Sequence, residues 1–144
     1  MLESKVFAAH RTLVQVYQTA HWLSKGSTFY SDHLLYERLY NEASAIIDGM
    51  AEKFISVAGE DCVNPVVVSK EVCDMLESYQ QESSPEALLE NSCGFQLAAL
   101  KITKEYYLVM KQEDKLSLGL DDFLMALCND HEHRLYLLEQ RKKG

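Results

Sequence analysis

Five residues in the first half of the chain carry side chains that bind transition metals. They are His21, His33, Glu37, Asp48 and Glu52. Imidazole nitrogen and carboxylate oxygen are ligands that suit iron, zinc or manganese, whereas a soft-metal site would need sulfur. The last four residues fall on one predicted helix, where about 100° of rotation per residue places them within a single stripe. Each residue of the stripe has a partner four positions away, so the stripe holds two pairs that can each bind one ion.

A single chain cannot bring both pairs to one ion. Glu37 and Asp48 are separated by 11 positions, which along a helix is roughly 16 Å, whereas metal–ligand bonds are about 2 Å long. The pairs meet if two copies of the helix pack antiparallel about a two-fold axis midway between them. The histidine-containing pair of one copy then faces the acidic pair of the other, and the dimer has two identical sites. His21, at the end of the preceding helix, can join the half that contains His33.

Four segments have apolar side chains at helical spacing and predict long helices. These helices cover approximately residues 3–24, 29–58, 85–115 and 120–142. The segment 60–83 is irregular, and although Val66–Val68 allows a strand, its polar spacing suits a short helix better. We therefore predict an all-α four-helix bundle with a short extra helix in the crossover between the second and third helices, in a single domain over residues 1–144. Gly49, inside the second helix, costs about 1 kcal/mol relative to alanine and predicts close packing there.

The sequence lacks the pattern of a metal centre inside one bundle. The usual di-iron bundle needs a Glu-x-x-His pair from each of two helices, and no such pair occurs in this chain. Two further histidines, His131 and His133, lie two positions apart on the predicted fourth helix. They face different ways, so we expect structural roles for both.

Composition restricts the remaining classes of protein. The 144 residues are 47% apolar, which is enough for a buried core and argues against disorder. No segment approaches 18 consecutive apolar residues, and no apolar stretch follows a basic start, so we expect neither a membrane span nor a secretory signal. The net charge of −8 argues against a protein that coats nucleic acid. The four cysteines form no CxxC pair, which favours reduced thiols in a cytoplasmic protein.

The residues around His21 and His33 resemble a signature of the Dps mini-ferritins, the DNA-protection-during-starvation family of the ferritin-like superfamily. The matching residues of this HW…KG…F…H signature are His21-Trp22, Lys25-Gly26, Phe29 and His33. The continuation through Glu37 and Asp48-x-x-Ala51-Glu52 is similar to the family's ferroxidase run, H-x11-H-x3-D-x10-D-x3-E, with every spacing kept. The resemblance is strong over residues 10–60 and fair over residues 120–140.

The resemblance implies a fold, an assembly and an activity. Dps proteins are ferritin-like bundles that assemble into a hollow homododecamer. They oxidise ferrous iron with hydrogen peroxide or oxygen at sites shared across the two-fold interface, and they store ferric mineral in the cavity. Iron is thus the expected metal, with zinc or manganese as substitutes.

The resemblance also assigns roles to individual residues. His21, His33 and Glu37 come from one subunit and complete the weaker iron site. The tightly bound iron is held by Asp48 and Glu52, which come from the partner. Trp22, which follows His21, is implied to protect against radicals. We also expect Trp22 to pack in the core.

Some positions depart from the family pattern. Glu37 stands where the family usually has aspartate, and Tyr136 stands where its terminal helix usually has tryptophan. Acidic residues at the start of that helix line the family's three-fold pores, and Asp122 aligns best with them, with Asp114 as an assisting acid.

Two other functions remain open. The chain lacks the lysine-rich tail of DNA-binding members, because it starts MLESKVFAAHR and ends RKKG, so we expect weak or no DNA binding. A catalytically weak Dps-like shell with a structural or DNA-associated role is nevertheless the main alternative. A helical-bundle interaction protein without metal is the third.

Overall fold

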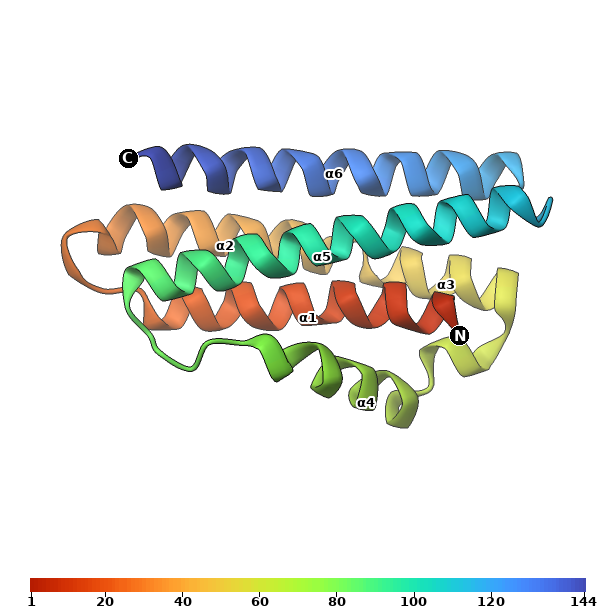
Figure 1. Ribbon diagram of the computed structural model, residues 1–144, viewed down its shortest axis with the longest axis horizontal. Coiled ribbons are helices and arrows are strands. Elements are labelled where there is room, and N and C mark those ends of the chain that lie inside the picture. The colour runs from red at the N-terminus through yellow and green to blue at the C-terminus, as the bar shows by residue number, and fades with distance from the viewer.

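The computed structural model describes all 144 residues, which form helices joined by short turns and no strands (Figure 1). The α-helices are α1 (Leu2–Leu23), α2 (Phe29–Ala45), α3 (Ile47–Ala58), α4 (Pro65–Met75), α5 (Pro85–Gln112) and α6 (Leu118–Lys143). Single 3-10 turns are η1 (Gly26–Thr28), η2 (Glu60–Val63) and η3 (Leu76–Ser78). The four long rods of the bundle are α1, α2 with α3, α5 and α6, while α4 crosses the outside of α1 (Figure 1). The predicted all-α bundle with an extra helix in the crossover is confirmed.

The starts of α4 and α5 follow from local hydrogen bonds. Ser84 caps α5 by accepting a bond from the amide of Ala87 at 3.1 Å, and Pro85 occupies its first turn. In the same way Asn64 caps α4. The segment after Asn64 is therefore a helix, as its polar spacing indicates, and the strand interpretation is wrong.

The second rod is not one helix over residues 29–58, as the sequence predicted. It is interrupted at Ile46, whose φ and ψ are −101° and −1°. His10 of α1 inserts at this point, because its Nε2 donates a 2.7 Å hydrogen bond to the carbonyl oxygen of Ala43. In a continuous helix that oxygen accepts from the amide of Ile47, and a side chain inserted into the ladder is a known cause of a break. The prediction of close packing at Gly49 is also wrong for a single chain, since an added Cβ there would meet nothing within 4 Å.

The core has two apolar halves along α1. The first half contains Val6 and Phe7 of α1 with Phe54 and Tyr106, and the second contains Leu13, Tyr17, Leu39 and Leu138 among others. His10 lies where the two halves meet. The buried residues of α1 are mostly apolar and recur at helical spacing along its length, so this one helix contacts both halves.

A buried polar network links α1, α5 and α6. Gln96 accepts hydrogen bonds from the hydroxyl of Tyr17 and from Nε of Arg134 (3.1 Å), and its own amide donates to Nδ1 of His131 at 2.7 Å. The guanidinium of Arg134 donates to the same Nδ1 at 3.1 Å. Burial lowers the pKa of His131 to about 2 and that of His10 to about 4. This network therefore holds a guanidinium and neutral histidines and contains no carboxylate.

Candidate metal centre

The two candidate histidines meet where α1 ends and α2 begins. The rings of His21 and His33 are stacked, with centroids 3.8 Å apart and planes at 17°. Nδ1 of His21 lies 2.8 Å from the carbonyl oxygen of His33, and Nδ1 of His33 lies 2.9 Å from the carbonyl oxygen of His21. A carbonyl oxygen only accepts hydrogen bonds, so each Nδ1 must carry the proton and each Nε2 has a free lone pair. This is the tautomer and the orientation that a metal-binding histidine needs.

The corner between α1 and α2 is built by its own sequence. Ser24 ends α1 by donating from Oγ to the carbonyl of Ala20 at 2.7 Å, and Gly26 then takes a φ of +82°, which glycine adopts without strain. Lys25 tethers the corner to the start of α5, since its Nζ donates to the carbonyl of Ser83 at 2.6 Å. The ring of Phe29 stacks on His33 at 5.1 Å. The histidine pair is thus held from both sides by short, local contacts.

The three candidate carboxylates, unlike the histidines, have no hydrogen-bond partners in the chain. Glu37 is half-buried one turn beyond His33, whereas Asp48 and Glu52 are exposed on α3. None of the three makes a side-chain hydrogen bond or an ion pair in the chain. No group of three or more metal-binding side chains is close enough to hold an ion. The fold therefore brings His21 and His33 together and leaves the acidic pair apart from them, in agreement with their separation along the rod.

The candidate residues share one surface face of α2 and α3. Positions three or four apart are exposed or half-buried along this face, which we call the α2–α3 face; they are Tyr30, Leu34, Glu37, Asn41, Ala45, Asp48 and Glu52. Tyr30 is 72% exposed and Leu34 is 44% exposed. Large apolar side chains exposed beside unpaired charges are typical of an interaction surface.

Other predicted positions are placed as follows. Trp22 is 66% exposed, so the expectation that it packs in the core is wrong; it follows the last buried turn of α1 and points outward. Asp122 is exposed in the first turns of α6, and Asp114 is exposed in the preceding loop, where its φ of 58° is one that aspartate tolerates. Neither of these two acids has a side-chain partner in the chain.

The remaining histidines have structural settings. His131 is buried in the polar network, so its predicted structural role is confirmed. His133 is near the surface, with Nε2 3.4 Å from a guanidinium nitrogen of Arg38 and its ring stacked on Tyr136 at 6.1 Å. All four cysteines are free, and Cys62 is buried.

Sequence reasoning missed Asp32, which lies directly before His33 and pairs with Arg141 of α6 at 2.6 Å. One feature of the sequence indicated this pair: Asp32 lies on the apolar side of a predicted helix. A carboxylate buried there requires a positively charged partner.

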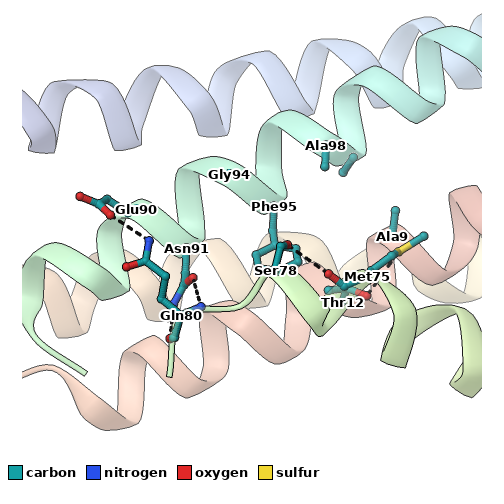
Figure 2. Close-up of a pocket in the computed structure, with 11 residues that line it drawn as sticks. Ala9, Thr12, Met75, Ser78, Gln80, Glu90, Asn91, Gly94, Phe95 and Ala98 are labelled. Carbon is teal, nitrogen blue, oxygen red and sulfur yellow. Dashed lines mark hydrogen bonds between the residues drawn. The ribbon is translucent and has the colours of Figure 1, made fainter. Parts of the chain in front are cut away.

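A separate pocket of about 390 Å³ lies between α1, the end of α4 and α5 (Figure 2). Asn91 closes one side by bonding to both backbone groups of Gln80, at 2.9 and 3.0 Å. The pocket is lined by none of the candidate metal residues, so it has no part in the candidate centre.

Comparison with known proteins finds relatives of this chain. No family model matches the chain. DNA protection during starvation protein 2 of Bacillus anthracis is 24% identical over 125 residues, which are 82% of this chain and 78% of that protein. General stress protein 20U of Bacillus subtilis (strain 168) is 30% identical over 104 residues, which are 71% of this chain and 61% of that protein.

Solved structures agree with these relatives. Dps from Thermosynechococcus elongatus superposes with a TM-score of 0.78 at 19% identity, covering 96% of this chain and 88% of that one. For a Dps protein from Bacillus brevis the TM-score is 0.79 at 22% identity, over 96% and 91% of the two chains. The chain is similar to Dps mini-ferritins in sequence and shares their fold. The resemblance predicted from the HW…KG…F…H signature is confirmed, and the ferritin-like bundle is the Dps fold. No helix is both long and apolar enough to cross a membrane.

Proposed function

We propose that this Dps-like chain oxidises ferrous iron at a site shared by two subunits and stores the ferric product in a homododecameric shell. The observation that carries the proposal is the reciprocal bonding of His21 and His33, which leaves both Nε2 atoms free to bind metal. Two histidines alone make an incomplete site, since iron prefers a mixed set of imidazole and carboxylate ligands.

The second half of the site comes from a partner subunit. Asp48 and Glu52 lie on the same α2–α3 face as the histidine half and have no partner in their own chain. An antiparallel two-fold contact through this face sets the acidic pair of one subunit against the histidine half of the other. Tyr30 and Leu34 are apolar and exposed on the same face. A two-fold contact through this face would bury them.

In this arrangement the chain binds iron as its substrate. His21, His33 and Glu37 hold one ferrous ion, and the partner's acidic pair holds the other more tightly. Two ferrous ions, one hydrogen peroxide and two protons give two ferric ions and two waters, so peroxide takes both electrons at once and no hydroxyl radical is released. Oxygen is the second oxidant, and zinc or manganese can occupy the same ligands.

The remaining acidic and aromatic residues have supporting roles in the proposal. Asp122, assisted by Asp114, lines a pore that attracts ferrous ions into the shell, in keeping with the net charge of −8. Trp22 is exposed beside His21 and supplies an electron to stray oxidants formed there.

The test is the rate of ferrous oxidation by peroxide in the Asp48→Ala/Glu52→Ala variant. We expect a loss of at least about 100-fold, because removal of supporting groups alone costs 10–100-fold in metal sites. The matched control is Glu77→Ala/Glu82→Ala, which removes two exposed carboxylates away from the α2–α3 face and should leave the rate unchanged. An acidic-pair variant as fast as the parent contradicts the assignment.

A catalytically weak shell with a DNA-associated role is the second candidate, because two relatives are named for DNA protection. A gel shift at low and moderate salt tests it, since phosphate-driven binding weakens steeply with salt. The absence of a shift at low salt removes this candidate.

A further inference from the structure

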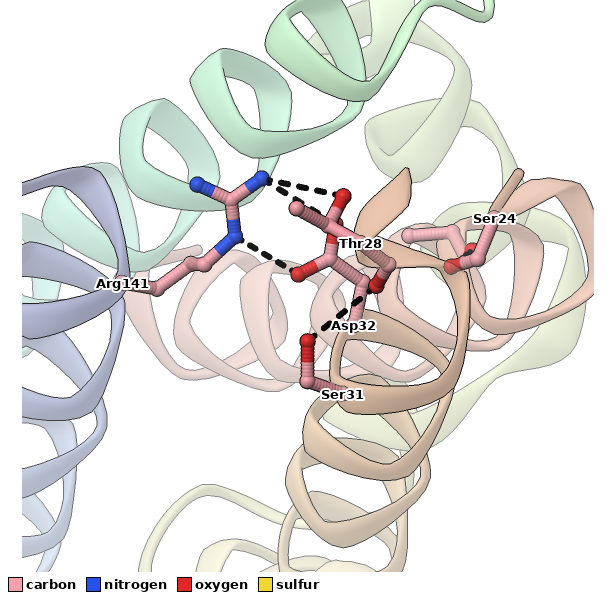
Figure 3. A network of polar contacts seen from close by, with 6 residues as sticks. Ser24, Thr28, Ser31, Asp32 and Arg141 are labelled. Carbon is pink, nitrogen blue, oxygen red and sulfur yellow. Dashed lines mark hydrogen bonds and ion pairs between the residues drawn. The ribbon is translucent and has the colours of Figure 1, made fainter. Parts of the chain in front are cut away.

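Next to the candidate centre, the end of α6 is tied to the first turn of α2 (Figure 3). Arg141 donates from Nε to Oδ1 of Asp32 at 2.6 Å and from Nη2 to Oδ2 at 3.1 Å. Thr28 donates from Oγ1 to the same Oδ2 at 2.8 Å and lies 3.4 Å from Nη2. We call these three residues the Arg141 clasp.

The clasp is largely buried, and both carboxylate oxygens of Asp32 are paired. Only 4% of the Asp32 side chain is exposed, and 23% of that of Arg141. The hydrogen bond to Asp32 raises the pKa of Arg141, so the arginine stays charged. Each carboxylate oxygen of Asp32 accepts a hydrogen bond from Arg141 or Thr28. This acid therefore positions the first turn of α2 and is not available to bind metal.

The clasp holds two residues that precede His33 along the chain, Thr28 and Asp32. Asp32 directly precedes His33, and Thr28 directly precedes Phe29, whose ring stacks on His33 at 5.1 Å. His33 in turn fixes His21 through their reciprocal bonds. Helix ends fray when nothing restrains them, and the first turn of α2 is such an end. A restraint on that turn therefore restrains both imidazoles.

We propose that Arg141 and Asp32 are positioning residues of the metal centre, which hold the His21–His33 pair in its metal-binding geometry from the far end of the chain. The inference rests on the proposed function of that centre. Neither residue touches the metal; both act through the first turn of α2. Without the clasp, Asp32 is buried and unpaired and the turn that carries His33 loses its anchor.

The test is the binding of Co2+, used alone as the probe, to the assembled protein and to Asp32→Asn and Arg141→Gln. Both variants should bind Co2+ about 10–100-fold more weakly, with an altered visible spectrum of the bound ion. Arg141→Lys keeps the charge but loses the two-point contact, and we expect an intermediate affinity. The matched control is Arg38→Gln, which breaks the exposed ion pair of Arg38 with Glu42 on the same helix and should leave affinity and spectrum unchanged.

Thermal unfolding and mass in solution establish that each variant is folded and assembled. Should Asp32→Asn or Arg141→Gln not fold, Thr28→Val removes only the bridging hydroxyl and should still weaken Co2+ binding severalfold. Folded clasp variants with the parent's affinity and spectrum overturn the inference, even if the parent oxidises iron as proposed. A different result would contradict the proposed function as well as this inference. In that case the parent binds no Co2+, and the Asp48→Ala/Glu52→Ala variant oxidises iron at the parent's rate.

Discussion

The two halves of the candidate centre differ in how much of their geometry one chain supplies. At the corner between α1 and α2, His21 and His33 are stacked, bonded to each other's backbone and packed against Phe29. On α3, Asp48 and Glu52 are exposed and have no partner. Folding of one chain therefore orders the histidine half, whereas in the proposed centre the acidic half is completed by a second subunit. A site divided in this way is complete only where two subunits meet.

The largest expected effect is on the rate of ferrous oxidation, and the free energy of unfolding then distinguishes the two halves. Both His21→Ala/His33→Ala and Asp48→Ala/Glu52→Ala should lower ferrous oxidation by at least about 100-fold. Only the histidine variant should lower the free energy of unfolding, by about 2 kcal/mol, because it removes two hydrogen bonds worth about 1 kcal/mol each. The acidic variant removes like charges four residues apart and should leave stability unchanged or slightly higher. Denaturant unfolding at fixed protein concentration measures this. Equal destabilisation by both variants contradicts the comparison.

A second prediction concerns the two histidines of the core, His10 and His131. Burial keeps His10 and His131 neutral, and the pKa of His10 is lowered to about 4. Below about pH 6.5 the unfolded chain binds protons that the folded chain refuses, so stability is complete above pH 6.5 and falls toward pH 4 by about 1 kcal/mol per pH unit for each histidine. Urea unfolding between pH 7 and pH 4 should show this slope, and His10→Gln should reduce it. An unchanged slope in His10→Gln excludes His10 as its source.

The smallest expected effect concerns the rod between the two halves. Gly49→Ala should stabilise the protein by up to about 1 kcal/mol, since alanine is the better helix former and the added Cβ meets nothing within 4 Å. Thermal unfolding measures the change. A loss of stability would mean that Gly49 contacts another subunit closely, which would extend the acidic half into the interface.

Local features of the sequence predicted the fold well. The apolar spacing predicted the long helices, and the one expected from residue 85 begins at Pro85 in the structure. These features depend on residues within one or two turns of each other. The separation of Glu37 from Asp48 is equally local, so the division of the candidate set needed no tertiary information.

The features that sequence reasoning missed depend on distant residues. The break at Ile46 follows from the imidazole of His10, which is 33 residues from the carbonyl that it contacts. Asp32 is paired by an arginine 109 residues away. Trp22 was expected in the core because it is large and apolar, yet it lies outside the buried stripe of α1. Helical spacing predicts which face of a helix is buried. It does not predict which residue of another helix contacts that face.

The central claim, that the site is shared by two subunits, is tested most directly by mixing two inactive variants. His21→Ala/His33→Ala and Asp48→Ala/Glu52→Ala subunits are combined in equal amounts, dissociated and reassembled, and peroxide-driven ferrous oxidation is measured. Random pairing makes half of the two-fold pairs mixed, and each mixed pair has one intact site of two, so about a quarter of the parent rate should return. A mixture as inactive as its two components, with assembly confirmed by mass, contradicts a shared site.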